Sequence, residues 1–405
     1  MNQMFSNIFN WVNNRLPIVN TFERHLSKHP VPKKVNFWYL FGALASVVLI
    51  IQIVSGIWLI MPYENTEEGA FASVEYIMRD VDYGWVIRYM HTTGASLFFA
   101  VVYLHMFRGL LYGSYQKPRE LVWIFGCTIY LAMMAEGFLG YVLPYGQMSY
   151  WGAQVIISLF GAIPYVGESL ELWVRGDYYI SGITVSRFFA LHVVALPLVL
   201  IALVFLHLVA LHEVGAGNPE GVDIEEHLDE DGIPLDSVPF FPYKVLNALV
   251  GIGVFMTVFA IIMFFFPEGG GYFIEMANFE EANPLVTPEH IAPVWYYSPY
   301  YAMLRAVPDK LGGLIVMGSA VAILFVVPWL DRSRVASIRY KGVYSKMALA
   351  FFGISFLTLG YLGTVGVTEV RKTMSVICTV IYFAFFLLMP FYTTYEKTKE
   401  VPKRL

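Results

Sequence analysis

Apolar runs of about 20 residues constrain this chain most, because each is long enough to cross a bilayer as a helix. The 405 residues are 57% hydrophobic and only 14% charged, which excludes an ordinary soluble domain. Eight such runs lie near residues 37–61, 85–108, 121–143, 188–211, 245–266, 311–330, 347–363 and 374–392. The sequence therefore predicts an all-α integral membrane protein with eight transmembrane helices.

Basic residues predict the orientation of these helices. If both termini lie on the inner side, 18 of the 26 Lys and Arg residues fall on that side and 8 elsewhere. Because cytoplasmic loops carry an excess of Lys and Arg, we expect both termini to be cytoplasmic.

An acidic segment divides the chain. Residues 1–212 hold four predicted helices, and residues 243–405 hold four more. The linker between them, 213–242, has nine acidic residues and no Lys or Arg, which is typical of a solvated cytoplasmic loop. Two long loops fall on the outer side, 145–180 and the Pro-rich 267–310, and loops of this length are usually functional.

Four histidines lie inside the apolar runs of the first half. His91 and His105 are 14 residues apart on one run, and His192 and His207 lie on another. Fourteen helical residues advance ~21 Å and end within ~40° of the starting face, so each pair spans the membrane on one face. A lone membrane histidine is more often a packing residue, but two pairs at matched depths favour metal ligands. This arrangement predicts two haems stacked across the bilayer, each held by two histidines and without an open position, as in electron carriers.

The second pair has an irregular spacing. His192 and His207 are 15 residues apart, which rotates the second histidine by roughly 100° relative to a spacing of 14. Pro197 lies between them, and a bulge or kink there would absorb the extra residue. His212 is the alternative ligand.

Glycines repeat the spacing of 14 on the neighbouring runs. Gly42 and Gly56 lie on the first run, and Gly126 and Gly140 lie on the third. A glycine allows a flat macrocycle to approach the backbone, and the alternative role is helix–helix packing.

Cations near the histidines would pair with the anionic haem propionates. Arg88 and Arg187 precede His91 and His192, and Arg108 follows His105, with Ser114 beyond it. Charged groups at these depths are costly unless they are paired.

Six stretches carry a resemblance to a known family. They are RYMHTTGAS (88–96), FRGLLYGSY (107–115), GYVLPYGQMSYWGA (140–153), RFFALH (187–192), TPEHIAPVWY (287–296) and PWLD (328–331). The chain resembles cytochrome b of the quinol–cytochrome c reductase (cytochrome bc) complex, of the bacterial respiratory type, over nearly its whole length. The resemblance implies that the first four helices form a bundle around two non-covalent b haems. The outer haem, of low potential, would be held by His91 and His192. The inner haem, of high potential, would be held by His105 and His207.

The resemblance also implies two quinone sites. The outer, quinol-oxidising site would be built from Tyr141, the segment 146–153, Pro293, Trp295, Tyr296 and Tyr301. The inner, quinone-reducing site would use His212.

The family's reaction implies partners and a location. Quinol oxidised at the outer site would send one electron to a Rieske iron–sulfur subunit and the other through both haems to the inner quinone. This Q cycle would generate a proton motive force across the bacterial inner membrane. We expect a membrane cytochrome c subunit and a dimeric complex, and no nucleic-acid partner.

Two departures from the family pattern concern protons. The usual Pro-Glu-Trp-Tyr motif reads Pro-Val-Trp-Tyr at 293–296, so its carboxylate is missing. Glu136, in a span where the family has a small neutral residue, is our candidate replacement, with Glu289 as the second candidate and a structural hydrogen bond as the alternative role of Glu136. At the inner site, Asn247 and Ala248 replace a usual Lys-Asp pair, which leaves Lys244 and Glu213 as candidate proton donors.

Two other kinds of protein share this hydropathy. A haem-free polytopic transporter would leave the histidine and glycine spacings unexplained. A dihaem membrane anchor of a dehydrogenase usually has four or five spans and lacks the Pro-Val-Trp-Tyr loop.

Overall fold

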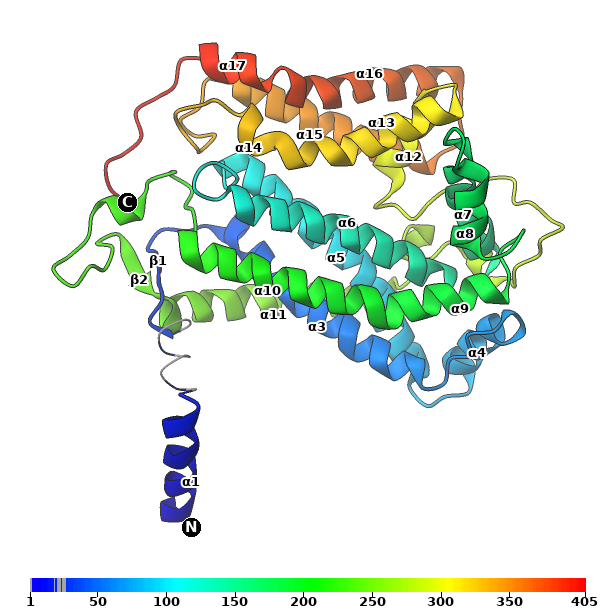
Figure 1. Cartoon of the computed structure of the whole chain (residues 1–405), viewed down its shortest axis with the longest axis horizontal. Coiled ribbons are helices and arrows are strands. Elements are labelled where there is room, and N and C mark those ends of the chain that lie inside the picture. The colour runs from blue at the N-terminus through cyan, green and yellow to red at the C-terminus, as the bar shows by residue number, and fades with distance from the viewer. Residues whose placement is uncertain (1, 18, 20–22, 24–26) are drawn as a thin grey trace.

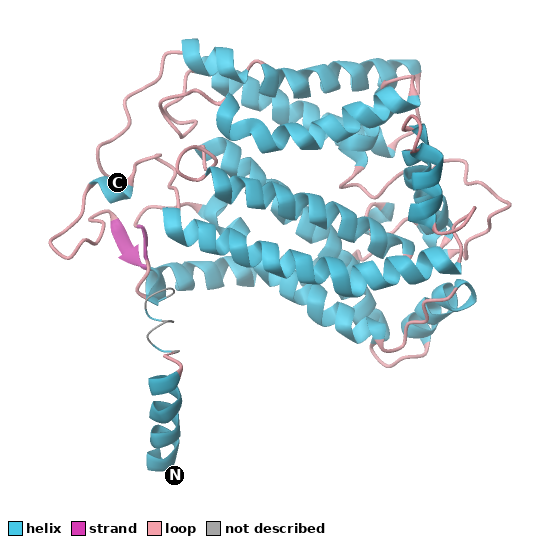
Figure 2. Cartoon of the chain, in the orientation of Figure 1, coloured by secondary structure: helices cyan, strands magenta, loops and turns pink. Residues whose placement is uncertain are grey.

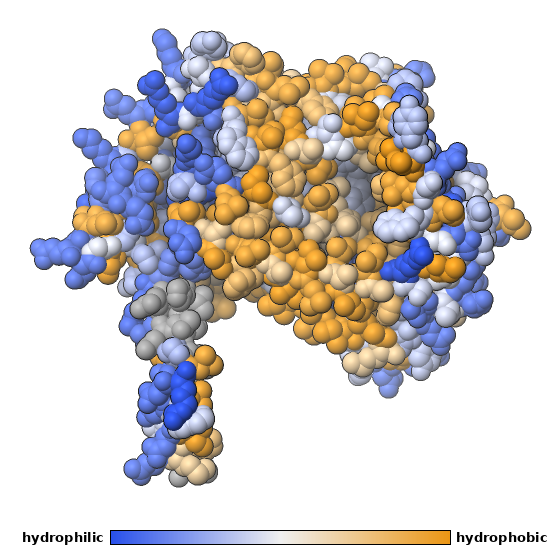
Figure 3. All heavy atoms as spheres, viewed as in Figure 1, coloured by the Kyte–Doolittle hydropathy of each residue, from blue (hydrophilic) through white to orange (hydrophobic). Residues whose placement is uncertain are grey.

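Eight membrane-length helices run side by side in the computed structural model, which describes residues 2–17, 19, 23 and 27–405. Their apolar side chains form a band across the middle of the molecule, and polar side chains gather at its two ends (Figure 3). The eight predicted spans are therefore confirmed within the described residues. They are α3 (Phe41–Ile60), α5 (Gly84–Tyr112), α6 (Glu120–Val142), α9 to α10 (Gly182–Val214), α11 (Val245–Phe265), α13 to α14 (Lys310–Leu330), α15 (Val343–Thr364) and α16 (Glu369–Leu387).

Three helices begin earlier than predicted, two of them at polar caps. α9 (Gly182–Ala190) begins six residues before the predicted 188, because Ser181 and Thr184 form a reciprocal capping box. α16 begins five residues before 374, because the Thr368 side chain accepts from the Arg371 N–H. α15 also begins four residues before 347, so the span predicted as the shortest is 22 residues long. Hydropathy alone misses a first turn made of polar residues.

The eight helices form two groups in space (Figure 1). α3 packs on α5, and α6 packs on α10 (Leu196–Val214), which makes the predicted four-helix bundle. α11 packs against α3 and α5, so it joins this bundle although the linker separates it in sequence. In space, α11 therefore belongs with the first group, although it follows the linker at residue 243 in the chain. The second group is α12 (Ser298–Ala306), α13 (Lys310–Ala322), α15 and α16.

The predicted long outer loops contain helices. Residues 145–180 form α7 (Gln147–Ser158) and α8 (Gly167–Arg175), and residues 267–310 contain α12. Another outer helix, α4 (Glu67–Arg79), begins at Thr66, whose side chain accepts from the Gly69 N–H at 3.0 Å. The remaining regular elements are α1 (Asn2–Arg15), α14 (Val327–Leu330), α17 (Met389–Tyr395), β1 (Pro30–Pro32) and β2 (Ser237–Pro239). Figure 2 shows that helices dominate and that the only two strands among the described residues lie at the inner end.

Buried hydrogen bonds join the two helix groups. The Trp123 indole N–H donates to the Leu324 carbonyl at 2.7 Å, and the Tyr130 hydroxyl donates to that of Tyr300 at 3.0 Å. The Tyr103 hydroxyl also donates to the Tyr296 carbonyl. A polar group without a partner in the apolar region is costly, so these bonds restrict how α12 and its preceding loop dock on the bundle.

The acidic linker is anchored, which corrects its prediction as a simple solvated loop. β2 pairs antiparallel with β1, with Val238 opposite Val31. Asp236 is buried, and its carboxylate accepts from Lys33 at 2.5 Å and from Arg404 Nε at 3.0 Å. The two cations hold the pKa of Asp236 well below its usual range. The linker thus ties both terminal segments to the same end of the molecule (Figure 1).

We predict that Asp236→Asn lowers the stability of the protein at neutral pH. The lost charge-assisted hydrogen bonds contribute about 2 kcal/mol. Because the folded pKa of Asp236 lies below its unfolded value of about 3.9, this contribution is complete above that value and is lost as the pH falls through the folded pKa. Thermal unfolding in detergent at pH 7 and below pH 4 should show a difference from wild type that shrinks on acidification. Glu230→Gln, at an exposed position of the same linker, is the control and should have no effect; equal effects of both variants would contradict the prediction.

Candidate functional site: two facing histidine pairs

The four histidines of the first half face each other in two pairs. The ring centroids of His91 and His192 are 6.2 Å apart, and those of His105 and His207 are 6.3 Å apart. A metal–imidazole bond of about 2.0 Å, plus about 1.1 Å from that nitrogen to the ring centre, separates two imidazoles on one metal by about 6.2 Å. Both pairs therefore have the separation that two axial ligands of one haem iron require.

A π-helical turn compensates for the extra residue in the spacing of 15 between His192 and His207. This turn, Leu191–Ala195, joins α9 to α10 and ends two residues before Pro197. A π-turn inserts one residue into the helix, so 15 residues return to the same face as 14 residues of regular helix. The bulge predicted from the sequence is present, and His207, rather than His212, faces His105.

The four glycines lie directly against the histidine rings. A Cβ atom built on Gly42 or Gly56 would lie 3.2 Å from His105 and 3.3 Å from His91, respectively. On α6, the same atom would lie 3.5 Å from His207 at Gly126 but 2.4 Å from His192 at Gly140. The glycines therefore make room for the imidazole of the neighbouring helix. The sequence suggested instead that they make room for the macrocycle.

Hydrogen bonds orient the outer pair. His91 Nδ1 lies 2.9 Å from the Ser55 hydroxyl oxygen. His192 Nδ1 lies 3.0 Å from the Glu136 backbone oxygen and 3.0 Å from its carboxylate Oε1. With Nδ1 held in this way, Nε2 of each ring is left to bind a metal.

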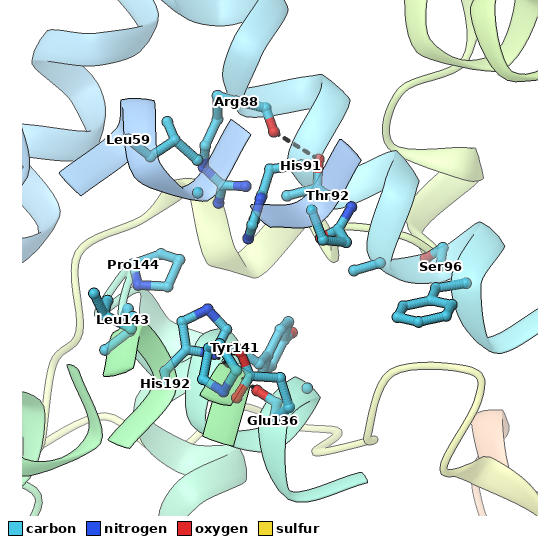
Figure 4. A pocket seen from close by; sticks show the side chains of 18 of the residues that line it. Leu59, Arg88, His91, Thr92, Ser96, Glu136, Tyr141, Leu143, Pro144 and His192 are labelled. Carbon is cyan, nitrogen blue, oxygen red and sulfur yellow. Dashed lines mark hydrogen bonds and ion pairs between the residues drawn. The ribbon is translucent and has the colours of Figure 1, made fainter. Parts of the chain in front are cut away.

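A cavity of about 250 Å³ contains the outer pair (Figure 4). His91 and His192 project toward one another across it, and Glu136 and Tyr141 lie beside His192. Tyr296 also lines the cavity and stacks on Phe99 at 3.9 Å between ring centroids. The outer histidine pair and part of the predicted outer quinone site therefore share one space.

Three other residues predicted for the outer site lie near this cavity without lining it. The Trp295 indole N–H donates to Ser96, which lines the cavity, at 3.3 Å. Tyr301 donates to the Ile291 carbonyl at 3.3 Å, and Pro293 directly precedes the turn that contains Tyr296, which begins at Val294. Pro293, Trp295 and Tyr301 are not among the lining residues.

Asn278 is a site residue that the sequence did not reveal. It lines the cavity, and its side chain accepts from the Ser149 N–H at 2.8 Å and donates to the Ser149 hydroxyl at 3.0 Å. It thereby joins the segment 146–153 to the second long loop. Loop contacts between residues 129 positions apart have no local sequence signal.

Glu275, on the same loop, was also not predicted. Burial raises the pKa of its carboxyl to about 7. Glu289 is exposed and does not line the cavity, so of the two carboxylates predicted for the outer site only Glu136 reaches it.

The predicted propionate cations differ in position. Arg88 lines the outer cavity (Figure 4). Arg108 donates to Ser114 at 3.0 Å, so two residues predicted to act together are in contact. The Arg108 guanidinium also stacks over the Tyr39 ring. Arg187 does not line the cavity; its exposed guanidinium donates to the Trp173 carbonyl.

Residues predicted for the inner site lie at the opposite end. The His212 ring lies 4.5 Å from that of His29, between ring centroids. Lys244 donates to the Lys33 carbonyl at 3.1 Å, and Glu213 is exposed.

Comparison with known proteins agrees with this geometry. Residues 26–215 match the family "Cytochrome b/b6/petB", and residues 281–383 match "Cytochrome b(C-terminal)/b6/petD". Cytochrome b of Allochromatium vinosum is 56% identical over 98% of this chain and 97% of its own length. Cytochrome b of Rhodospirillum rubrum is 46% identical over 97% of this chain and 94% of its own.

The chain belongs to the cytochrome b family.

Membership in the cytochrome b family implies a haem cofactor and a role as the membrane subunit of an electron-transferring oxidoreductase, so the haem-free transporter is excluded. A solved structure described as "Hyperthermophilic respiratory Complex III" superposes with a TM-score of 0.89 at 36% identity, covering 96% of this chain and 99% of that one. This cytochrome b therefore shares the fold of the respiratory type, with eight candidate membrane spans in one chain.

We predict that alanine substitution of Gly140 and of Gly126, which both lie against histidine rings, has different effects on haem content. Gly140→Ala places a methyl group 2.4 Å from His192 and should displace that ring, whereas Gly126→Ala makes an ordinary contact at 3.5 Å from His207. The haem-to-protein ratio of purified protein should fall in the first variant and stay at the wild-type value in the second. An equal loss in both variants would contradict the geometry.

Proposed function

We propose that this chain is the dihaem cytochrome b of a respiratory quinol–cytochrome c oxidoreductase, with its outer haem on His91 and His192 and its inner haem on His105 and His207. The observation that carries the proposal is the equal separation of the two facing pairs, 6.2 and 6.3 Å. Haem bound at these pairs supplies one-electron transfer between two quinone sites.

The protein's own residues hold and orient these groups. Two histidines on each haem iron would leave it no open position for oxygen, which suits electron transfer. Gly42, Gly56, Gly126 and Gly140 let the imidazoles lie close to the neighbouring backbone. Arg88, in the outer cavity, and Arg108, one turn after His105, place positive charge where propionates need it.

The outer cavity is the proposed quinol-oxidising site. Tyr141 and Tyr296 line it, and Asn278 holds the segment 146–153 in place. Because Val294 replaces the motif carboxylate, we assign the quinol proton to Glu136, whose Oε2 is buried without a hydrogen-bond partner among the described residues. His212 marks the proposed inner quinone site, with Lys244 and Glu213 as its candidate proton donors.

The proposed reaction defines the partners and the orientation. A Rieske iron–sulfur subunit would accept one of the two quinol electrons at the outer site, and a membrane cytochrome c subunit would receive it next. Both terminal segments meet at the end opposite the outer cavity (Figure 1), which supports cytoplasmic termini in a bacterial inner membrane. Release of protons outside and uptake inside would generate the proton motive force, in a complex that we expect to be dimeric.

Replacing the inner ligand tests the haem assignment. We predict that His207→Leu removes one of the two haems, whereas His212→Leu retains both, because only His207 faces His105. Haem content per chain and the reduced-minus-oxidised spectrum would show this. Loss of a haem in the His212 variant alone would overturn the assignment.

Replacing the proposed proton acceptor tests the outer site. We predict that Glu136→Gln slows quinol oxidation about 100-fold, the scale of a lost general base. Glu289→Gln is the matched control and should turn over normally, since its side chain is exposed outside the cavity. Quinol–cytochrome c reductase activity in membranes measures both, and near-normal turnover of the Glu136 variant would refute its proton role.

A further inference from the structure

The four candidate ligands differ in what contacts the nitrogen that faces away from the metal. His192 Nδ1 has the Glu136 carboxylate oxygen at 3.0 Å, in addition to the backbone oxygen of the same residue. His91 has a neutral hydroxyl, from Ser55, at 2.9 Å. Nδ1 of His105 is buried without a hydrogen-bond partner among the described residues, and Nδ1 of His207 is buried beside the neutral backbone of Val122. Among the residues that the structure describes, a carboxylate therefore contacts only His192 of the four ligands.

We propose that Glu136 is a positioning residue for His192, and that its carboxylate lowers the midpoint potential of the outer haem relative to the inner one. This inference rests on the proposed function, because it assumes haem on His91 and His192.

The chemistry follows from what surrounds Nδ1 of His192. Its N–H donates to the Glu136 backbone carbonyl, which fixes the ring, and the carboxylate Oε1 of the same residue lies 3.0 Å from that nitrogen. The negative charge beside Nδ1 makes Nε2 a stronger electron donor. A stronger donor stabilises the more highly charged, oxidised iron and so lowers the potential. Burial strengthens the effect, because both side chains are mostly enclosed, with exposed fractions of 16% and 19%.

The packing of α6 against α9 and α10 explains why Glu136 reaches this nitrogen. Gly140 lies one turn further along α6 and leaves room for the His192 ring, whose Nδ1 then meets the backbone and side chain of residue 136. The π-helical turn at Leu191–Ala195 contains His192 and sets its direction. The inner pair has the same glycine clearance at Gly126 without an acidic neighbour at Nδ1.

A redox titration of the haem-loaded protein tests the inference. In Glu136→Gln, which keeps the shape but removes the charge, the outer haem should become easier to reduce by about tenfold in its equilibrium constant, equal to ~59 mV for one electron. The inner haem should not move. Ser55→Ala is the matched control: it removes a neutral acceptor from the opposite ligand and should give a smaller shift.

Each outcome is decisive. An unchanged outer potential, or an equal shift of both haems, would overturn the proposal. If Glu136→Gln does not retain haem, Glu136→Asp, which keeps the charge, should retain it with a potential near that of wild type; a large upward shift in that variant would also overturn it.

The titration needs no quinol, so it separates this inference from the proposed function. Absence of two b-type components in the wild type would contradict the proposed function itself. A raised outer potential would favour electron transfer from quinol, so slow quinol oxidation in Glu136→Gln would arise from the missing proton acceptor and not from the potential.

Discussion

The separation between facing imidazoles is the constraint on which the first half of this protein depends. Two pairs of rings, at two depths, have centroids 6.2 to 6.3 Å apart. This separation requires a fixed spacing between α5 and the helix formed by α9 and α10. It also requires α3 and α6, which pack on α5 and α10, to approach the rings closely. Glycine at four contact points satisfies the second requirement, and a π-helical turn keeps the two ligands of α9 and α10 on one face. Both are needed together: the glycines make room for the imidazoles, and the π-helical turn directs His192 and His207 toward their partners.

The bilayer imposes a second constraint, which explains how the two helix groups are joined. Trp123, Tyr103 and Tyr130, within the apolar band, donate to carbonyls or to another hydroxyl across the boundary between the groups. These bonds hold the loop that carries Tyr296 against the bundle, so the cavity beside His91 and His192 has one wall from the bundle and one from this loop. At the inner end, Asp236 joins the terminal segments by charge instead.

Much of this arrangement could be predicted from the sequence because its signals are periodic. Spacings of 14 placed the histidines and glycines on common faces, and the extra residue before His207 predicted the bulge. The position of α11 against α3 and α5, the Glu136–His192 contact and the Asn278–Ser149 bridge were not predictable, since each depends on packing between segments far apart in the chain. The sequence also could not show that Arg187 and Glu289 lie outside the cavity, because suitable chemistry near a motif does not show where a side chain points.

A potentiometric titration of the reduced-minus-oxidised haem spectrum, on the purified wild-type protein, tests the central claim most directly. The account predicts two b-type components with well-separated potentials, one for each histidine pair. A single component, or no haem, would contradict it.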